Sequence, residues 1–118
     1  MTTSQTNPLG PGYEGVAGSE MRFRDIFRDT LRAEMNRDDD VFLMGEDISG
    51  GFDKDTKEPL DAWGGPFAAT KGLVQEFGVE RIRDAPISEA GFVGAAVGSA
   101  LTGMRPVVDL MYFDFVTV

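Results

Sequence analysis

The chain has 118 residues, a net charge of −9 at pH 7 and a hydrophobic fraction of 42%. It contains neither cysteine nor histidine, which excludes disulfides, thiolate or imidazole metal sites and a Ser-His-Asp triad within the chain. The acidic balance argues against nucleic acid or a membrane as partner, because both require clustered lysine and arginine. No signal peptide or membrane span is recognisable, so we expect a cytoplasmic protein.

Residues 1–20 are rich in Gly, Pro, Ser and Thr, which is typical of a flexible tail; an arm that orders on a partner is the alternative. The next segment predicts a helix, because its apolar residues recur on one helical face: Phe23, Ile26, Phe27, Leu31 and Met35. Asp38–Asp40 would oppose the helix dipole, so the helix is expected to end before them. We interpret these acids as a solvated turn rather than a cation site.

The run VFLMG at 41–45 predicts a buried strand. Residues 46–66 predict a long loop. Within it, DKDTKEPLDAWG is superficially similar to a calcium-binding loop, but Glu58 stands where glycine is needed and Gly64 where the closing glutamate belongs. The glycine pairs of the loop do not match a phosphate-binding fingerprint either.

The second half of the chain predicts a helix at 69–78, a strand at 81–86, a helix at 88–101 and a strand at 105–113. Gly78 and Gly103 are expected to end the two helices. Helices and strands therefore alternate, which indicates an α/β layer with a parallel sheet. The chain stops on FDFVTV without a closing polar segment, so we expect it to be the front part of a longer protein.

The helix at 88–101 is built almost wholly of small residues, although each interior glycine costs about 0.5–1 kcal/mol relative to alanine. Gly94 and Gly98 are four residues apart and share a face. Such a face favours a close contact with another helix, either inside the domain or across a subunit boundary.

Glu89 stands near the start of this helix and has two interpretations. Ser88 could cap the helix, and an acid in the first turn is favoured by the helix dipole by about 0.3–1 kcal/mol. However, Ile87 and Phe92 are apolar, so the carboxylate is expected to be partly buried, and a buried carboxylate either has a partner or has a raised pKa.

Longer segments carry a resemblance to a known family: VFLMGEDI, TKGLVQEFG and RIRDAPISEAGFVGAAVGSALTGMRPVVDLMYFDF. They resemble the beginning of the beta subunit of the thiamine-diphosphate-dependent first component of 2-oxo acid dehydrogenase complexes. The resemblance covers residues 21–118. It implies a transketolase-like pyrimidine-binding domain, with the diphosphate and magnesium bound by an alpha subunit. Glu89 matches the catalytic glutamate of that family, which hydrogen-bonds ring nitrogen 1′ of the aminopyrimidine and sets its tautomer.

Further cofactor-binding residues follow from the same resemblance. Ile87, Met111 and Phe115 match residues that surround the pyrimidine ring, with ordinary core packing as the alternative. Glu46 follows the first strand, where ligands bind in open α/β sheets, with loop capping as the alternative. Val118 stands where some relatives carry a glutamine near the cofactor, so that contact is expected to be absent.

The implied function is oxidative decarboxylation of a 2-oxo acid with acyl transfer to a lipoyl group on an acyltransferase core. The implied assembly is a heterotetramer of alpha subunits and two beta chains. DAWGG before TKGL is most similar to acetoin-cleaving members of the family. The family continues well beyond residue 118, so the chain alone is expected to be inactive. The alternative is a non-catalytic interaction module that uses the Gly94 and Gly98 face.

Overall fold

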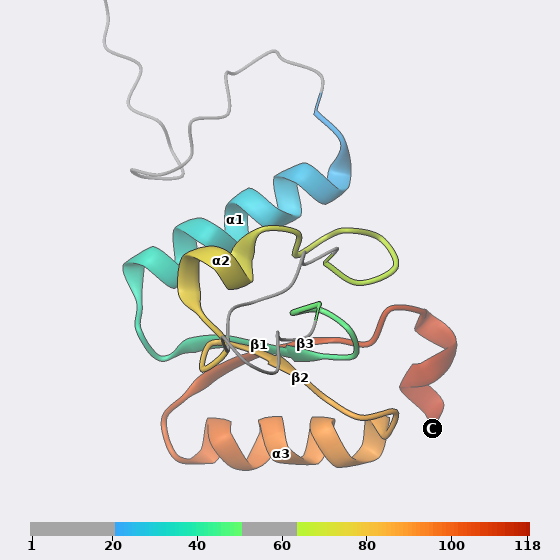
Figure 1. Cartoon of the computed structure of the whole chain (residues 1–118). Helices are drawn as coiled ribbons and strands as arrows, with labels where there is room; N and C mark the ends of the chain where they lie inside the picture. Colours follow the sequence, from blue (N-terminus) through green and yellow to red (C-terminus); the bar gives the residue numbers. More distant parts are fainter. Residues whose placement is uncertain (1–20, 51–63) are drawn as a thin grey trace, which may run out of the picture.

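The computed structural model describes residues 21–50 and 64–118, which form an open α/β unit (Figure 1). The predicted tail and residues 51–63 of the predicted loop lie outside the described residues. The elements, in chain order, are α1 (Phe23–Arg37), β1 (Val41–Gly45), α2 (Leu73–Phe77), β2 (Ile82–Asp84), α3 (Glu89–Leu101), β3 (Arg105–Asp109) and the short 3-10 helix η1 (Phe113–Thr117).

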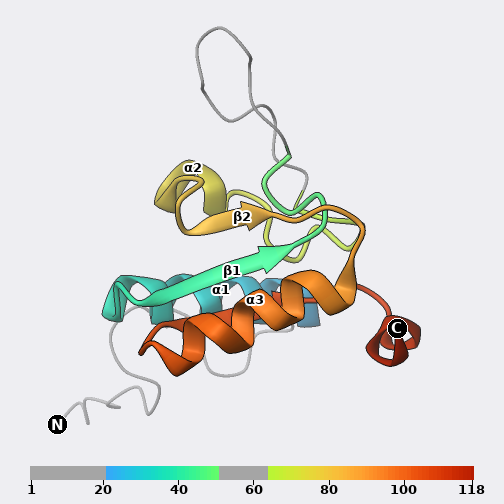
Figure 2. The ribbon, with the colours of Figure 1, turned by 90° about the horizontal axis from the view of Figure 1, so that it is seen from below.

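The strands form a three-stranded sheet in the order β2-β1-β3, and both outer strands run parallel to β1. The register places Leu43 of β1 opposite Ile82 on one side and Val107 on the other. Helices α1 and α2 cover one face of the sheet and α3 covers the other (Figures 1 and 2). The predicted α/β class with a parallel sheet is therefore confirmed.

Helix α1 is confirmed, but its apolar face is buried only along its second half. Met35 is 1% exposed and Leu31 is buried, whereas Phe23 is 84% exposed and Ile26 and Phe27 are also exposed. The second half packs beside the buried core, which lies on the side of the sheet covered by α1 and α2. The members of this core are Leu31, Met35, Val41, Leu43, Ile48, Leu73, Val74 and Ile82.

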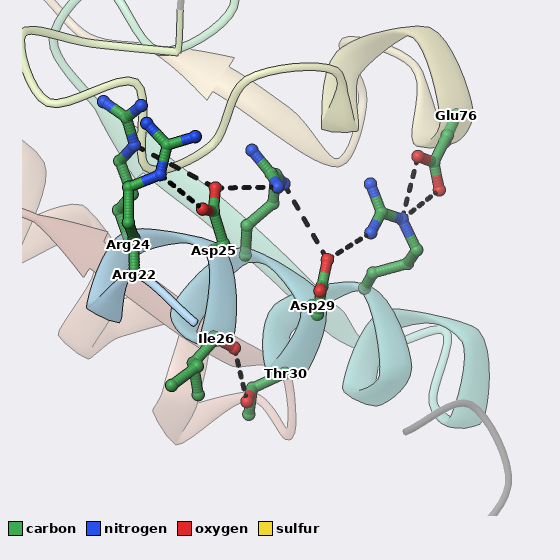
Figure 3. A network of polar contacts seen from close by, with 9 residues as sticks. Arg22, Arg24, Asp25, Ile26, Asp29, Thr30 and Glu76 are labelled. Carbon is green, nitrogen blue, oxygen red and sulfur yellow. Dashed lines mark hydrogen bonds and ion pairs between the residues drawn. The ribbon is translucent and has the colours of Figure 1, made fainter. Parts of the chain in front are cut away.

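A series of ion pairs runs along α1 and connects this helix to α2 (Figure 3). Arg28 Nη2 lies 3.0 Å from Asp25 Oδ1, and Arg32 Nη1 lies 2.7 Å from Asp29 Oδ1. Arg32 Nε also donates to both carboxylate oxygens of Glu76, each at 2.8 Å. The hydrogen bond to Glu76 raises the pKa of the Arg32 guanidinium, so this ion pair persists throughout the physiological pH range.

The acidic run after α1 is a turn that two arginines bind. The helix ends at Arg37, as predicted, and Asp38 Oδ2 lies 2.7 Å from Arg105 Nη1. The Arg81 guanidinium donates to the carbonyl oxygens of Asp38 and Val41, with Nη2 at 2.7 Å from each. These contacts join the amino-terminal ends of the strands, opposite the edge where ligands bind in such folds.

The helix predicted at 69–78 is wrong in its first half. Gly72 has a φ of 88° and Ala68 a φ of 53°, so the chain turns repeatedly before α2 begins. The end of the helix is as predicted, with Gly78 as its C-cap at a φ of 73°.

The strand predicted at 105–113 is too long. It ends at Asp109, because the Asp109 carboxylate accepts the main-chain N–H of Met111 at 2.8 Å and Met111 adopts a left-handed φ of 60°. The strand predicted at 81–86 is also shorter, because β2 covers only Ile82–Asp84. Tight turns follow β1 and β3 where these strands leave the sheet.

Candidate cofactor site

The predicted site residues all follow the carboxyl ends of the strands. Glu46 comes directly after β1, Ile87 and Glu89 follow β2, and Met111 and Phe115 follow β3. Because the strands are parallel, their carboxyl ends meet at one edge of the sheet. Both views show the start of α3 and the segment η1 at this same end of the molecule (Figures 1 and 2).

The carboxylates of Glu46 and Glu89 are half-buried, and within residues 21–50 and 64–118 neither makes a hydrogen bond or ion pair. The other half-buried acidic side chains of the described residues all have partners: Asp25, Asp29, Glu34, Asp38 and Asp109. Partly buried carboxylates normally have partners, because desolvation without compensation costs free energy. Glu46 and Glu89 are therefore the half-buried carboxylates of the described residues that are available to an external group.

Glu89 is the first residue of α3, and Ser88 is its N-cap residue. The predicted side-chain cap by Ser88 is wrong, because the Ser88 hydroxyl makes no capping hydrogen bond. Instead the hydroxyl lies against Gly91, where an added Cβ would stand 2.7 Å from it. The first turn of α3 therefore leaves main-chain N–H groups without a side-chain cap next to the Glu89 carboxylate.

The predicted apolar site residues differ in exposure. Ile87 is 80% exposed, which rules out core packing within residues 21–50 and 64–118. Phe115 is half-buried and packs edge-on against Tyr112, with ring centroids 5.8 Å apart. Met111 is half-buried and holds a positive φ. Ile87 thus remains free to contact a ligand or another chain.

A pocket of about 860 Å³ lies at the same edge but on the face covered by α1. Of the predicted site residues, only Met111 lines it. Its lining includes aromatic side chains from α1, from the loop before α2 and from the segment after β3: Phe23, Phe27, Phe67, Tyr112 and Phe113. The pocket therefore does not enclose Glu89, and geometry within this chain does not bring all predicted residues into one cavity.

Sequence reasoning missed Ser49, Asp84 and Asp109. Ser49 is 1% exposed, and its main-chain N–H donates to Asp84 Oδ1 at 2.8 Å while its hydroxyl donates to Asp84 Oδ2. Asp84 and Asp109 are the last residues of β2 and β3. Strand-terminal aspartates beside turn residues were the signal that would have indicated them.

The residues at this edge fit an uncharged ring system better than a metal or a diphosphate. Unpaired carboxylates next to apolar side chains can accept hydrogen bonds from, or share a proton with, a heterocyclic nitrogen. Within the described part of the chain there is no group of three or more metal-binding side chains.

The Gly94 and Gly98 face of α3 points away from the sheet. An added Cβ at either glycine would meet no atom within 4 Å, and the neighbouring Val97 and Leu101 are exposed. A close helix contact inside the described part of the chain is therefore excluded. Contact across a subunit boundary remains the interpretation for these glycines.

The fold defines the class of protein: an open α/β domain with a parallel sheet, of the kind in which ligands bind outside the carboxyl ends of the strands. The profile of the family described as "Transketolase, pyrimidine binding domain" matches residues 19–118. The chain belongs to this family of transketolase pyrimidine-binding domains.

Curated relatives of the chain are beta subunits of acetoin:2,6-dichlorophenolindophenol oxidoreductases and of pyruvate dehydrogenase E1 components. The chain is 48% identical over 92 residues to the acetoin:2,6-dichlorophenolindophenol oxidoreductase subunit beta of Bacillus subtilis, covering 78% of this chain and 27% of that protein. The subunit of the same name from Cupriavidus necator is 47% identical over 90 residues, which is 76% of this chain and 26% of that protein. The pyruvate dehydrogenase E1 component subunit beta of Rhizobium meliloti is 41% identical over 101 residues, covering 86% of this chain and 19% of that protein. The chain thus spans about a quarter or less of the length of these relatives.

Proposed function

We propose that the chain contributes the pyrimidine-binding part of a beta subunit in a thiamine-diphosphate-dependent 2-oxo acid dehydrogenase. Membership of the pyrimidine-binding family and similarity to E1 beta subunits support the proposal. The observation that carries it is the pair of half-buried carboxylates, Glu46 and Glu89, that lack a partner in the described residues at the ligand-binding edge. A domain that acts only as a scaffold has no reason to hold partly desolvated carboxylates unpaired.

In this proposal Glu89 is the catalytic residue. When bound, thiamine diphosphate supplies a thiazolium that accepts the electrons released on decarboxylation. The Glu89 carboxyl shares a proton with ring nitrogen 1′ of the aminopyrimidine. Its place at the start of α3 suits this role, because the helix holds the carboxylate at a fixed height above the sheet edge.

The remaining proposed site residues hold the ring. Phe115 offers an aromatic face, Met111 a polarizable side chain and Ile87 an exposed aliphatic surface. Glu46 lies in the loop after β1 and is a second carboxylate for a polar atom of the cofactor or of the partner chain. Together these residues would exclude water from the side of the ring that faces this chain.

The site is proposed to be completed by other chains. The diphosphate and its magnesium are assigned to the alpha subunit, as similarity to E1 beta subunits suggests. The exposed Ile87 and the open Gly94 and Gly98 face leave surface for the alpha subunit and for a second beta chain in a heterotetramer. The acyl group would pass to a lipoyl group on the acyltransferase core. A cytoplasmic location belongs to the same proposal, and no described helix is long and apolar enough to cross a membrane.

The test replaces Glu89 by glutamine in the complete beta subunit assembled with its alpha partner. The amide cannot share a proton, so kcat is expected to fall about 10²–10⁴-fold, the usual contribution of general acid–base catalysis. Glu80→Gln is the matched control, because Glu80 is exposed, lies before β2 at the opposite edge and makes no side-chain contact in the described residues. Normal turnover by the Glu89→Gln variant, or an equal loss in Glu80→Gln, contradicts the assignment.

A second candidate function differs from the first in its substrate, which would be acetoin instead of a 2-oxo acid. Acetoin cleavage is favoured by the two acetoin-type relatives at 48% and 47% identity, against 41% for the pyruvate-type relative. Initial rates of the assembled enzyme with acetoin, pyruvate and branched 2-oxo acids would rank the candidates. The remaining candidate is a non-catalytic interaction module. It predicts that the alpha subunit binds the chain while the complex has no measurable affinity for thiamine diphosphate in calorimetry.

A further inference from the structure

We propose that Asp84 and Asp109, the last residues of β2 and β3, are positioning residues for the cofactor edge. Each carboxylate accepts a main-chain N–H from a turn that carries a proposed site residue: Glu46 in one turn, Met111 in the other. The inference rests on the proposed function, because it concerns how the same edge is held in shape.

Asp84 holds the turn after β1 from the neighbouring strand. Its two carboxylate oxygens accept the main-chain N–H and the hydroxyl of Ser49, and Ser49 is itself 1% exposed. The same turn is held from its other side, where Asp47 O accepts the N–H of Gly65 at 3.2 Å. Glu46 lies between β1 and these contacts, so the direction of its free carboxylate depends on them.

Asp109 holds the turn after β3 within its own strand end. Oδ1 accepts the N–H of Met111 at 2.8 Å and thereby closes a turn in which Met111 has a φ of 60°. The Asp109 side chain is packed against β1, because a Cβ added to Gly45 would lie 2.9 Å from Asp109 Cβ. This packing restricts the position of the Asp109 carboxylate. By accepting the N–H of Met111, the carboxylate in turn restricts the backbone conformation of Met111.

Backbone strain gives an independent reason to see this edge as preorganised. In the described residues, the non-glycine positions with positive φ are Asp47, Ala68 and Met111. Asp47 and Met111 follow β1 and β3 at the carboxyl edge, and Ala68 lies in the loop that contacts the turn after β1. Strained conformations persist only where surrounding contacts enforce them, and they concentrate at ligand sites. The two aspartates supply such contacts.

The chain contains a matched control at the opposite edge. Asp38 Oδ1 accepts the N–H of Asp40 at 3.0 Å, the same spacing along the chain as Asp109 to Met111. Asp38→Ala therefore removes an equivalent turn contact, together with the ion pair to Arg105, where no cofactor residue is proposed. Asp109→Asn tests charge against geometry, because an amide oxygen can still accept the N–H of Met111.

The experiment uses the complete beta subunit assembled with its alpha partner, as Asp84→Ala, Asp109→Ala, Asp109→Asn and Asp38→Ala. First, amide hydrogen exchange without cofactor is expected to accelerate about tenfold or more at Ser49 in Asp84→Ala and at Met111 in Asp109→Ala. Second, the half-saturating concentration of thiamine diphosphate is expected to rise about tenfold or more in both alanine variants. Asp109→Asn should restore most of both properties, and Asp38→Ala should leave the half-saturating concentration unchanged.

Unchanged exchange at Ser49 and Met111 overturns the inference, because the carboxylates then do not hold the turns. Faster exchange with unchanged half-saturation also overturns it, because the turns then do not position the cofactor. An equal rise in Asp38→Ala overturns it as well, since the effect then reflects stability alone. If the wild-type assembly neither binds nor uses thiamine diphosphate, the proposed function itself is wrong. This failure is distinguishable from failure of the inference, because it shows in the wild-type binding measurement and not in the exchange rates of the variants.

Discussion

Replacing Gly94 and Gly98 by alanine should stabilise the chain by itself and weaken its assembly with a partner. Both glycines lie inside α3, and an added Cβ at either meets no atom within 4 Å. Each alanine should then stabilise the helix by about 0.5–1 kcal/mol. If the two effects add, the double variant gains about 1–2 kcal/mol, and 1 kcal/mol raises the midpoint of a domain of this size by about 4–8 °C.

The assay measures thermal unfolding of the purified chain by circular dichroism, and assembly with the alpha partner by sedimentation velocity. A higher midpoint together with weaker assembly is the expected pair of results, because two methyl groups keep a facing helix from close approach. A lower midpoint would refute the claim that this face is open within the chain. A higher midpoint with unchanged assembly would refute the subunit contact. Gly45→Ala is a control that should lower the thermal midpoint. Its added Cβ would stand 2.9 Å from Asp109 O, and overpacking costs about 1–3 kcal/mol of stability.

Further predictions concern the loops that hold the sheet. Gly64→Ala should lower the free energy of unfolding by about 3 kcal/mol or more, because Gly64 has a φ of 78° and an added Cβ would lie 2.2 Å from Lys71 N. A urea midpoint within error of wild type contradicts this. Arg81→Met should cost about 2–4 kcal/mol, because it leaves the carbonyls of Asp38 and Val41 without their charged donor. Arg81→Lys keeps the charge but lacks the guanidinium that donates to both carbonyls. Its urea midpoint should therefore lie between those of Arg81→Met and the wild type.

The alternation of helices and strands was predictable because it depends on local patterns. Apolar residues at helical spacing marked α1, and the run at 41–45 marked β1. Glycines marked the ends of α2 and α3, since a left-handed φ after a helix favours glycine. The order of the strands within the sheet, β2-β1-β3, was not predicted, because alternation of helices and strands indicates a parallel sheet but not which strands are neighbours.

The turns at the carboxyl edge were missed for two different reasons, one local and one long-range. The strand after Gly103 was expected to continue to residue 113, because the segment 105–113 is largely apolar and only its strand-terminal aspartate signals a turn. A single hydrogen bond from Met111 to Asp109 ends it instead. By contrast, the Ser49 and Asp84 contact joins residues 35 positions apart, which no local pattern indicates. The position of Glu89 at a helix start was predictable; its lack of a partner was not.

The surface at this edge argues that cofactor binding and assembly are linked. Ile87 and Phe113 are 80% and 86% exposed, and they lie at the same edge as the unpaired Glu89 carboxylate. Under the proposed function, a second chain that covers these apolar side chains would also exclude water from Glu89, and a drier carboxylate binds a ring nitrogen more strongly. Linkage then requires reciprocity: whatever factor assembly adds to the affinity for the cofactor, the cofactor adds to the affinity between the chains.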